Sequence, residues 1–541
     1  MMLLPRDMVA RCATNFPDKM AYACGTDART WREMDHRADA AARALRQLGV
    51  RQGDTVAWFG QECLVVYEHF FACMKLGAVR LGLNWRYSPA ELEHLVRDSG
   101  LRFVLVDARC VSLLQPLGAA LGELGVTLVG CGTGHGLALD YDDLLAAQAE
   151  QPCLPLVDIG GDDALMLTYT SGTTGRPKGV VHRQSAIAAM IFQSLVARGL
   201  GPDDIFCTAA ASSWMTVVLN LLGLGNGMGH VIPDGSFEVR AFLDDVQRHR
   251  VTAIMLVPTL IRRMLDEVRG GAHELGSLRL LMYGSAPASA ALIRDAYESL
   301  GCEMVQSYGM TEAGWTTQLG ASDHRRAVSH EPGLLKSAGR PGVLSEIQIR
   351  DDAGQRLAPG QAGTVWIRSS TLMKGYLNRP TETAEVLHGD WLCSNDVGYL
   401  DARGYLFLTD RRKFMIISGA VNIFPSSVEN ALQEHPDVAE AAVVGVPHPE
   451  WGEAVVAVVR ARTGAAADVP ALHAHCDARL NRMERPKHIF LVDDFPRSVN
   501  GKVQKQQVKE WVAARSHDLP WASAVRTQPR AEEPQTQETD T

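Results

Sequence analysis

Short apolar runs alternate with helix-like stretches along the first three quarters of this chain, and that alternation limits the folds it can adopt. Each run is followed by turn residues, which is typical of a buried strand, whereas the stretches between the runs have the pattern of helices. Such alternation favours parallel sheets covered by helices. The clearest expected strands are 163–169, 253–257 and 278–283, and the expected helices are 241–250, 259–268 and 288–300.

The pattern changes twice toward the C-terminus. Residues 345–368 alternate in polarity around the turn Asp352-Ala353-Gly354, which predicts a small antiparallel unit. A boundary follows near residues 410–413, and the segment beyond it has a compact α+β pattern. Its expected elements are a helix at 426–434, strands at 440–446 and 454–460, and a helix at 471–483. From residue 515 the chain is rich in Pro, Gln, Thr and Glu, so we expect disorder there.

The composition and the N-terminal sequence exclude several classes of protein. The formal net charge of -9 gives no general attraction to nucleic acid. The 11 cysteines include no C-x-x-C pair, which favours reduced thiols in a cytoplasmic protein. Pro5 and nearby charges interrupt the start before a signal-peptide core can form. The best membrane candidate, 214–232, contains Asn220, Asn226 and His230, so a buried or pocket-lining segment is the better interpretation.

One segment, Tyr169 to Gly179, has the composition of a phosphate-binding loop and directly follows an expected strand. Its glycines let consecutive N–H groups point at one anion, its Ser and Thr hydroxyls add donors, and Lys178 adds a positive charge. It is not a Walker A loop, because Pro177 stands where that motif needs glycine. The alternative is a flexible surface loop, which Gly/Thr-rich segments more often are.

This segment resembles the signature loop of the adenylate-forming superfamily, which includes acyl-CoA synthetases, peptide-synthetase adenylation domains and luciferases. The resemblance recurs in the family's order over roughly residues 10 to 512. Each matching segment alone would be a weak signal, and their common order and spacing make the resemblance specific. The further matches are Tyr308 to Glu312, Trp391 to Asp410 together with Arg411, Ser418 to Pro425, and Pro496 to Lys502.

The resemblance implies a particular α/β architecture. The large N-terminal domain would contain two doubly wound αβ subdomains plus a small β-barrel-like unit, followed by a small mobile α+β C-terminal domain. The expected bounds are 1–410 for the AMP- and acyl-binding domain, 411–413 for a hinge, 414–514 for the C-terminal domain and 515–541 for the tail.

The resemblance also implies an activity. The enzyme would use ATP and Mg²⁺ to activate a carboxylic acid as its acyl-adenylate, releasing pyrophosphate, and then transfer the acyl group to coenzyme A. It would thus be an AMP-forming acid–thiol ligase located in the cytoplasm. Its binding partner would be a small-molecule carboxylic acid, and the resemblance allows a homodimer. No nucleic acid and no integral membrane association are expected. Two alternatives stay open, a carrier-protein-loading enzyme and a non-catalytic nucleotide-binding protein.

The matched motifs imply roles for individual residues. Tyr308 would stack on adenine, opposite the backbone of 284–287, and Glu312 would hold Mg²⁺, a hard cation that prefers oxygen ligands. Asp396 would accept hydrogen bonds from both ribose hydroxyls. The implied nucleotide site comprises Thr170, Ser171, Gly172, Thr173, Thr174, Gly175, Lys178, Gly284, Ser285, Ala286, Tyr308, Gly309, Met310, Thr311, Glu312, Asp396, Arg411 and Lys502.

The implied catalytic residues are Lys502, Thr311 and Lys178. Attack of a carboxylate on phosphate brings two anions together, and Lys502 would supply the positioned cation that this step requires. Between half-reactions the C-terminal domain would rotate about Lys413, a hinge of the kind that absorbs large backbone changes. Ser418 and Gly419 would then line the path of the CoA thiol. The chain departs from the family pattern at Thr364, Phe414, Ala420 and Val421, and the last two leave the exact thiol path open.

The acyl pocket is expected beside Trp214, Gly284 and Gly309. The segment 211–218 lacks the histidine found in many relatives and carries Trp214, which could line the pocket or belong to the core. No Lys or Arg occurs between Ile205 and Val239, so a second carboxylate buried there would lack a partner unless a cation arrives from elsewhere. A small to medium acid with an apolar or aromatic body fits better.

Overall fold

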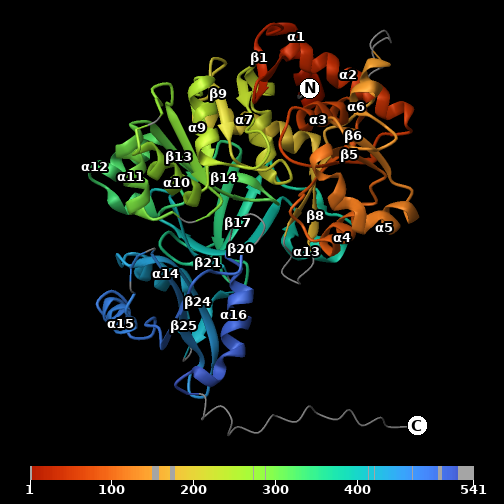
Figure 1. The fold of residues 1–541 in the computed structure, drawn as a ribbon. Coiled ribbons are helices and arrows are strands. Elements are labelled where there is room, and N and C mark those ends of the chain that lie inside the picture. The colour runs from red at the N-terminus through yellow and green to blue at the C-terminus, as the bar shows by residue number, and fades with distance from the viewer. Residues whose placement is uncertain are drawn as a thin grey trace, which may run out of the picture. The chain divides into compact units, whose positions relative to one another are not determined.

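The computed structural model describes residues 3–148, 157–170, 177–271, 273–286, 288–411, 414–418, 421–462, 464–465, 467–497 and 503–521. Two compact units divide the chain (Figure 1). The larger comprises Met1–Ser394 with Tyr399–Phe407, and the smaller comprises Asn395–Gly398 with Leu408–Thr541.

The first sheet of the larger unit has seven strands in the order β18-β8-β7-β4-β3-β5-β6. Its central strands are parallel, and both faces are covered by helices. The strands are β3 (Thr55–Phe59), β4 (Val79–Leu83), β5 (Phe103–Asp107), β6 (Thr127–Cys131), β7 (Ala164–Thr170), β8 (Lys178–Arg183) and β18 (Gly375–Tyr376). The helices around it include α1 (Pro5–Asn15), α2 (Trp31–Gln47), α3 (Val65–Leu76), α4 (Pro89–Ser99), α5 (Gly118–Glu123), α6 (Tyr141–Ala146) and α7 (Gln184–Arg198), with the 3₁₀ helix η1 (Ala108–Leu117).

The second sheet has nine strands in the order β15-β14-β13-β12-β11-β9-β10-β1-β2. Parallel pairing runs from β13 to β1, and the helices between these strands pack their apolar sides against it. The strands are β1 (Met20–Cys24), β2 (Asp27–Thr30), β9 (Ile205–Thr208), β10 (Gly229–Val231), β11 (Ala253–Leu256), β12 (Leu280–Gly284), β13 (Glu303–Met310), β14 (Gly314–Leu319) and β15 (Arg340–Pro341). The helices are α8 (Gly223–Asn226), α9 (Val239–Arg248), α10 (Pro258–Val268), α11 (Ala290–Leu300) and α12 (Ala321–Ser329), with η2 (Met215–Leu221) and η3 (Pro332–Lys336).

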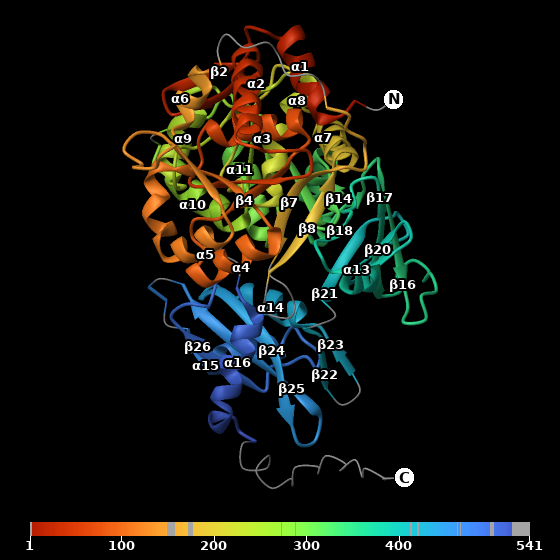
Figure 2. The same cartoon turned by 90° about the vertical axis from the view of Figure 1, so that its right-hand side faces the viewer.

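The predicted antiparallel unit is present as a third sheet, of five strands, in the teal part of Figure 2. Strands β16 (Ser345–Arg350) and β17 (Gly363–Ser369) pair antiparallel, which confirms the alternating pattern found in the sequence. The remaining strands are β19 (Leu387–His388), β20 (Trp391–Leu400) and β21 (Leu406–Arg411), and α13 (Pro380–Val386) precedes β19.

The smaller unit is an α+β structure around the long hairpin of β24 (Val438–His448) and β25 (Gly452–Ala461). Apolar clusters cover both faces of its sheet. The other elements are β22 (Ile416–Ser418), β23 (Val421–Ile423), β26 (His488–Val492), α14 (Pro425–Gln433), α15 (Val469–Asp477), α16 (Lys505–Ala514) and the 3₁₀ helix Ser516–Asp518. The large α/β domain followed by a smaller one confirms the predicted fold class.

The predictions for the smaller unit are wrong at two boundaries. Helix α15 ends at Asp477 instead of continuing to 483, because the Asn481 side chain accepts the Met483 N–H at 3.0 Å and forms a turn. The prediction of disorder is wrong for residues 515–521, since Leu519 is buried and the Trp521 indole donates to the Pro447 carbonyl at 3.0 Å.

No helix in the described part of the chain combines the length and the apolar character that crossing a membrane requires. The segment 214–232 instead forms η2, α8 and β10, whose residues are mostly buried in the larger unit. The interpretation of this segment as buried is therefore confirmed.

Candidate functional site

The two ends of the predicted phosphate loop lie side by side. Strand β7 ends at Thr170, β8 begins at Lys178, and these two residues are paired in the antiparallel register. Both side chains are half-buried. The loop residues Ser171, Gly172, Thr173, Thr174 and Gly175 lie outside the described residues.

The residues expected to bind adenine lie on two neighbouring parallel strands, β12 and β13, or directly after them. Gly284, the last residue of β12, pairs with Ser307 of β13, and Tyr308 follows directly. A side chain at Gly284 would collide with the Ser307 carbonyl oxygen, so this close approach requires glycine. Ser285 has φ 65°, an uncommon backbone conformation for a residue with a side chain. Strained turns of this kind cluster at functional sites, which agrees with the expected role of 284–286.

Glu312 lies in the tight turn that joins β13 to β14. It is 9% exposed, and the hydroxyl of Tyr376 donates a hydrogen bond to its Oε1 at 2.8 Å. The Glu312 carbonyl accepts the Met373 N–H at 2.8 Å, so a second bond holds the same residue. Thr311 lies half-buried beside it.

Tyr376 connects Glu312 to Lys178. The Lys178 ammonium nitrogen lies 5.3 Å from the centre of the Tyr376 ring, a cation–π arrangement. The chain around Tyr376 is also fixed to β8, because the Leu377 N–H donates to the Gly179 carbonyl at 2.7 Å. Burial and the neighbouring Glu312 carboxylate raise the pKa of the Tyr376 hydroxyl, so it remains a proton donor at neutral pH.

Sequence reasoning missed Tyr376. It stands 64 residues beyond Glu312, and the short strand β18 that carries it is visible only once the sheet has formed. An isolated tyrosine after a glycine gives no local signal that separates a positioning residue from a packing one.

Glu312 fits the expected binding of Mg²⁺. One carboxylate oxygen accepts from Tyr376, and the other can face a cation. No cluster of three or more His, Cys, Asp or Glu side chains that could hold a metal exists within the described ranges. Mg²⁺ usually takes one or two carboxylates plus substrate phosphates instead of such a cluster, so a single glutamate is adequate.

Asp396, Arg411 and Ser418 belong to strands β20, β21 and β22. Asp396 on β20 and Ser418 at the end of β22 are buried, at 6% and 1% exposure. Arg411 ends β21, but its side chain is not described. Lys413, Gly419 and Lys502 lie outside the described residues. The residues that the structure brings together are therefore Thr170, Lys178, Tyr376 and Glu312, and separately Gly284, Ser307 and Tyr308.

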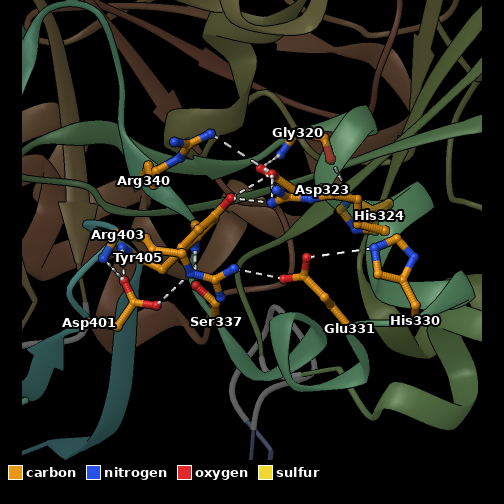
Figure 3. Close-up of polar contacts among 12 residues, drawn as sticks. Gly320, Asp323, His324, His330, Glu331, Ser337, Arg340, Asp401, Arg403 and Tyr405 are labelled. Carbon is orange, nitrogen blue, oxygen red and sulfur yellow. Dashed lines mark hydrogen bonds and ion pairs between the residues drawn. The ribbon is translucent and has the colours of Figure 1, made fainter.

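Within the larger unit, a polar network holds the turn between β20 and β21 (Figure 3). The Tyr405 hydroxyl donates to Asp323 Oδ1 at 2.7 Å, and Arg326 in turn donates to that hydroxyl at 2.6 Å. Arg403 pairs with Glu331 at 2.7 Å. The turn from Asp401 to Tyr405 is thereby fixed to the helical segment that carries Asp323, Arg326 and Glu331.

Trp214 is half-buried and precedes η2. Its ring meets Tyr87, in the loop after β4, edge to face with 6.1 Å between ring centres. The segment before it contains no cation of its own, but Arg80 of β4 donates to the Ser212 carbonyl at 2.7 Å. A cation therefore reaches this segment from elsewhere in the chain.

The chain matches known proteins along nearly its whole length. The profile described as "AMP-binding enzyme" matches residues 9–377, and that described as "AMP-binding enzyme C-terminal domain" matches residues 427–502. A feruloyl-CoA synthase of an Amycolatopsis species is 36% identical over 503 residues, covering 92% of this chain and 97% of the relative. The fatty acid–[acyl-carrier-protein] ligase ScoC of Streptomyces coeruleorubidus is 31% identical, covering 92% and 94%. The structure of the amide bond synthetase McbA from Marinactinospora thermotolerans is similar at a TM-score of 0.84 with 30% identity, covering 94% and 99%.

Proposed function

We propose that this chain, which belongs to the AMP-binding enzyme family, is an ATP-dependent acyl-CoA synthetase. It activates a carboxylic acid as an acyl-adenylate, releases pyrophosphate, and transfers the acyl group to coenzyme A with release of AMP. The observation that carries the proposal is the linkage of Lys178 and Glu312 through Tyr376. A cation at the start of β8 in the first sheet and a buried carboxylate suited to Mg²⁺ after β13 of the second sheet are thereby linked through one side chain.

In the first half-reaction an oxygen of the acid attacks the α-phosphorus of ATP, and the bond to the pyrophosphate oxygen breaks. Lys178 neutralises charge on the phosphates, and Thr311 donates a hydrogen bond to the α-phosphate. Mg²⁺ held by Glu312 supplies further charge neutralisation when bound. Lys502 offsets the repulsion between the two anions as they approach. Tyr308 stacks on the adenine, and Asp396 and Arg411 bind the ribose.

In the second half-reaction the CoA sulfur attacks the acyl carbon, and the bond to the AMP oxygen breaks. We assign residues 1–410 to the AMP- and acyl-binding domain, 411–413 to the hinge and 414–514 to the C-terminal domain. Rotation about Lys413 withdraws Lys502 and brings Ser418 and Gly419 to the thiol path, so that one substrate meets two sets of groups in turn.

The acid is small to medium in size, with an apolar or aromatic body. Trp214 is half-buried instead of lying in the core, which suits the wall of an acyl pocket. We also assign Gly284 and Gly309 to this pocket, where close packing against the backbone of Ser307 and Gly314 leaves no room for a side chain at either position. A cytoplasmic location and a homodimer remain predictions, and light scattering of the purified protein tests the second.

The alternative acceptor is a carrier protein, as the name of the relative ScoC states for that protein, whereas the feruloyl-CoA synthase supports CoA. A panel of acids with ATP and Mg²⁺, supplied with either CoA or a phosphopantetheinylated carrier protein, separates the two by mass spectrometry. We expect AMP and acyl-CoA in the CoA reaction. Adenylate without thioester in the CoA reaction, together with a loaded carrier, would contradict the CoA assignment.

A further inference from the structure

Charged side chains hold the main chain of Ser212 from both sides. The Ser212 N–H donates to Glu62 Oε1 at 2.7 Å, and its carbonyl accepts from Arg80 Nη1 at 2.7 Å. Glu62 lies between β3 and α3, and Arg80 lies on β4. Ser212 itself is 2% exposed and stands directly before Ser213 and Trp214. We refer to Glu62, Arg80 and Ser212 as the Ser212 clamp.

Strand β4 and the loop after it are shaped to receive the same segment. A side chain at Gly82 would place its Cβ 2.6 Å from Ser213 Cα and 2.7 Å from Arg80 Nη1. Because Gly82 has no side chain, the Ser213 backbone and the Arg80 guanidinium can both lie directly against this strand. Tyr87 then contacts the Trp214 ring. Residues 212–214 therefore contact one continuous stretch of β4 and its loop.

The Ser212 clamp buries two charged side chains, which costs free energy unless their polar atoms are fully paired. Arg80 is 1% exposed, and in the described structure its Nε and Nη2 atoms, like Glu62 Oε2, have no hydrogen-bond partner. Burial lowers the pKa of Arg80 and raises that of Glu62, which shows that neither charge gains its full hydration or pairing. Apolar side chains in the same volume usually stabilise a fold as well or better, whereas a buried ionic arrangement can specify one geometry.

We propose that Glu62 and Arg80 are positioning residues that fix segment 212–214 and thereby set which carboxylic acids the enzyme accepts. The inference rests on the proposed function, because segment 212–214 is the wall of the acyl pocket there. Neither side chain is among the residues assigned to ATP or to the reacting carboxylate. Their effect is on the shape of the wall, so changes at the clamp alter the order of preference among acids and leave nucleotide binding unchanged.

The test uses the full-length enzyme and ATP–pyrophosphate exchange with straight-chain acids of increasing length and with benzoate. Arg80→Met removes the donor to Ser212 while keeping similar volume, and Arg80→Lys is the conservative control. We expect Arg80→Met to change the ratio of kcat/KM between the bulkiest and smallest accepted acids by about tenfold, the usual range of apolar pocket discrimination. KM for ATP should stay within about twofold of the wild-type value, since no nucleotide contact is altered. Arg80→Lys should restore part of the wild-type order.

Gly82→Ala supplies an independent variant that leaves both charges in place and displaces Ser213. It should also change the order of the acids ranked by kcat/KM. If Arg80→Met does not fold, the result for Gly82→Ala alone tests the inference. An unchanged order of acids in both folded variants, with equal loss for every acid, would overturn the inference and make the clamp merely structural. Absence of exchange with every acid in the wild-type enzyme would instead overturn the proposed function.

Discussion

At the scale of single residues, the site depends on side chains that orient others. Tyr376 reaches Glu312 with its hydroxyl and Lys178 with its ring, so one residue fixes both charges of the expected ATP site. A hydrogen bond from a neutral donor to a carboxylate also restricts the directions in which that carboxylate can bind a cation. The placement of Glu312 is therefore determined before ATP and Mg²⁺ arrive.

Replacing Tyr376 by Phe should slow adenylate formation about tenfold, the expected effect of losing one hydrogen bond to a charged group. The ring over Lys178 is kept, so the half-saturating Mg²⁺ concentration should rise more than KM for ATP. Pyrophosphate exchange over a Mg²⁺ series provides the measurement. Tyr376→Leu, which loses both contacts, should be slower still. Equal activity of wild type and Tyr376→Phe at every Mg²⁺ concentration would show that the hydroxyl positions nothing.

Lys502→Ala should suppress adenylate formation by orders of magnitude, because no other cation is expected between the carboxylate and the α-phosphate. Thioester formation from supplied acyl-adenylate should survive, because the proposed mechanism uses Lys502 only in the first half-reaction. Separate assays of the two half-reactions check this. Equal loss in both would refute the assignment of Lys502.

At the scale of elements, glycines let the backbones of β13 and β14 pack closely together beside Tyr308 and Glu312. Gly309 pairs with Trp315, and a side chain there would collide with the Gly314 carbonyl oxygen. Gly314 has φ 66°, as the turn after Glu312 requires. The hairpin therefore cannot keep Tyr308 and Glu312 in place unless both positions are glycine.

We expect Gly309→Ala to lower the free energy of unfolding by about 1–3 kcal/mol, as overpacking of a close contact does. Adenylate formation should fall as well, because the strand must shift. Gly333→Ala is the matched control, since no atom lies within 4 Å of its added Cβ. Thermal unfolding of both variants gives the comparison, and equal melting temperatures would mean that the hairpin adapts without cost.

Elements with a clear period could be predicted, whereas contacts between distant residues could not. The expected strand 163–169 is β7 (Ala164–Thr170), and the expected helix 259–268 is α10 (Pro258–Val268). Local polarity determines such elements. Glu62 and Ser212 are 150 residues apart, and Arg80 and Ser212 are 132 apart. Their contact exists only because β3, β4 and the second sheet pack together, and nothing in the local sequence of either segment indicates it.

At the scale of the whole molecule, buried neutral histidines tie stability to pH. His69, His182 and His230 are fully enclosed in the larger unit, and burial lowers the pKa of each to about 3. In the unfolded chain each has a pKa of about 6.5. Between these values the unfolded chain binds more protons than the folded one, so stability falls as the pH falls below about 6.5.

Because of each of these histidines, the free energy of unfolding should be up to about 2 kcal/mol lower at pH 5 than at pH 7.5. His182→Leu should reduce this pH difference, because the ring nitrogens of His182 have no hydrogen-bond partner among the described residues. Denaturant unfolding at both pH values provides the measurement. A wild-type stability that is unchanged or higher at pH 5 would contradict the assignment of neutral histidines.

The central claim, that the acid's own oxygen attacks the α-phosphorus of ATP before thioester formation, is tested most directly by isotope transfer. An accepted acid labelled with ¹⁸O in its carboxylate is converted with ATP, Mg²⁺ and CoA, and the AMP formed is analysed by mass spectrometry. The mechanism predicts one ¹⁸O atom in each AMP molecule, because the bridging oxygen of the adenylate leaves with the phosphate. Unlabelled AMP, or label in inorganic phosphate beside ADP, would contradict it.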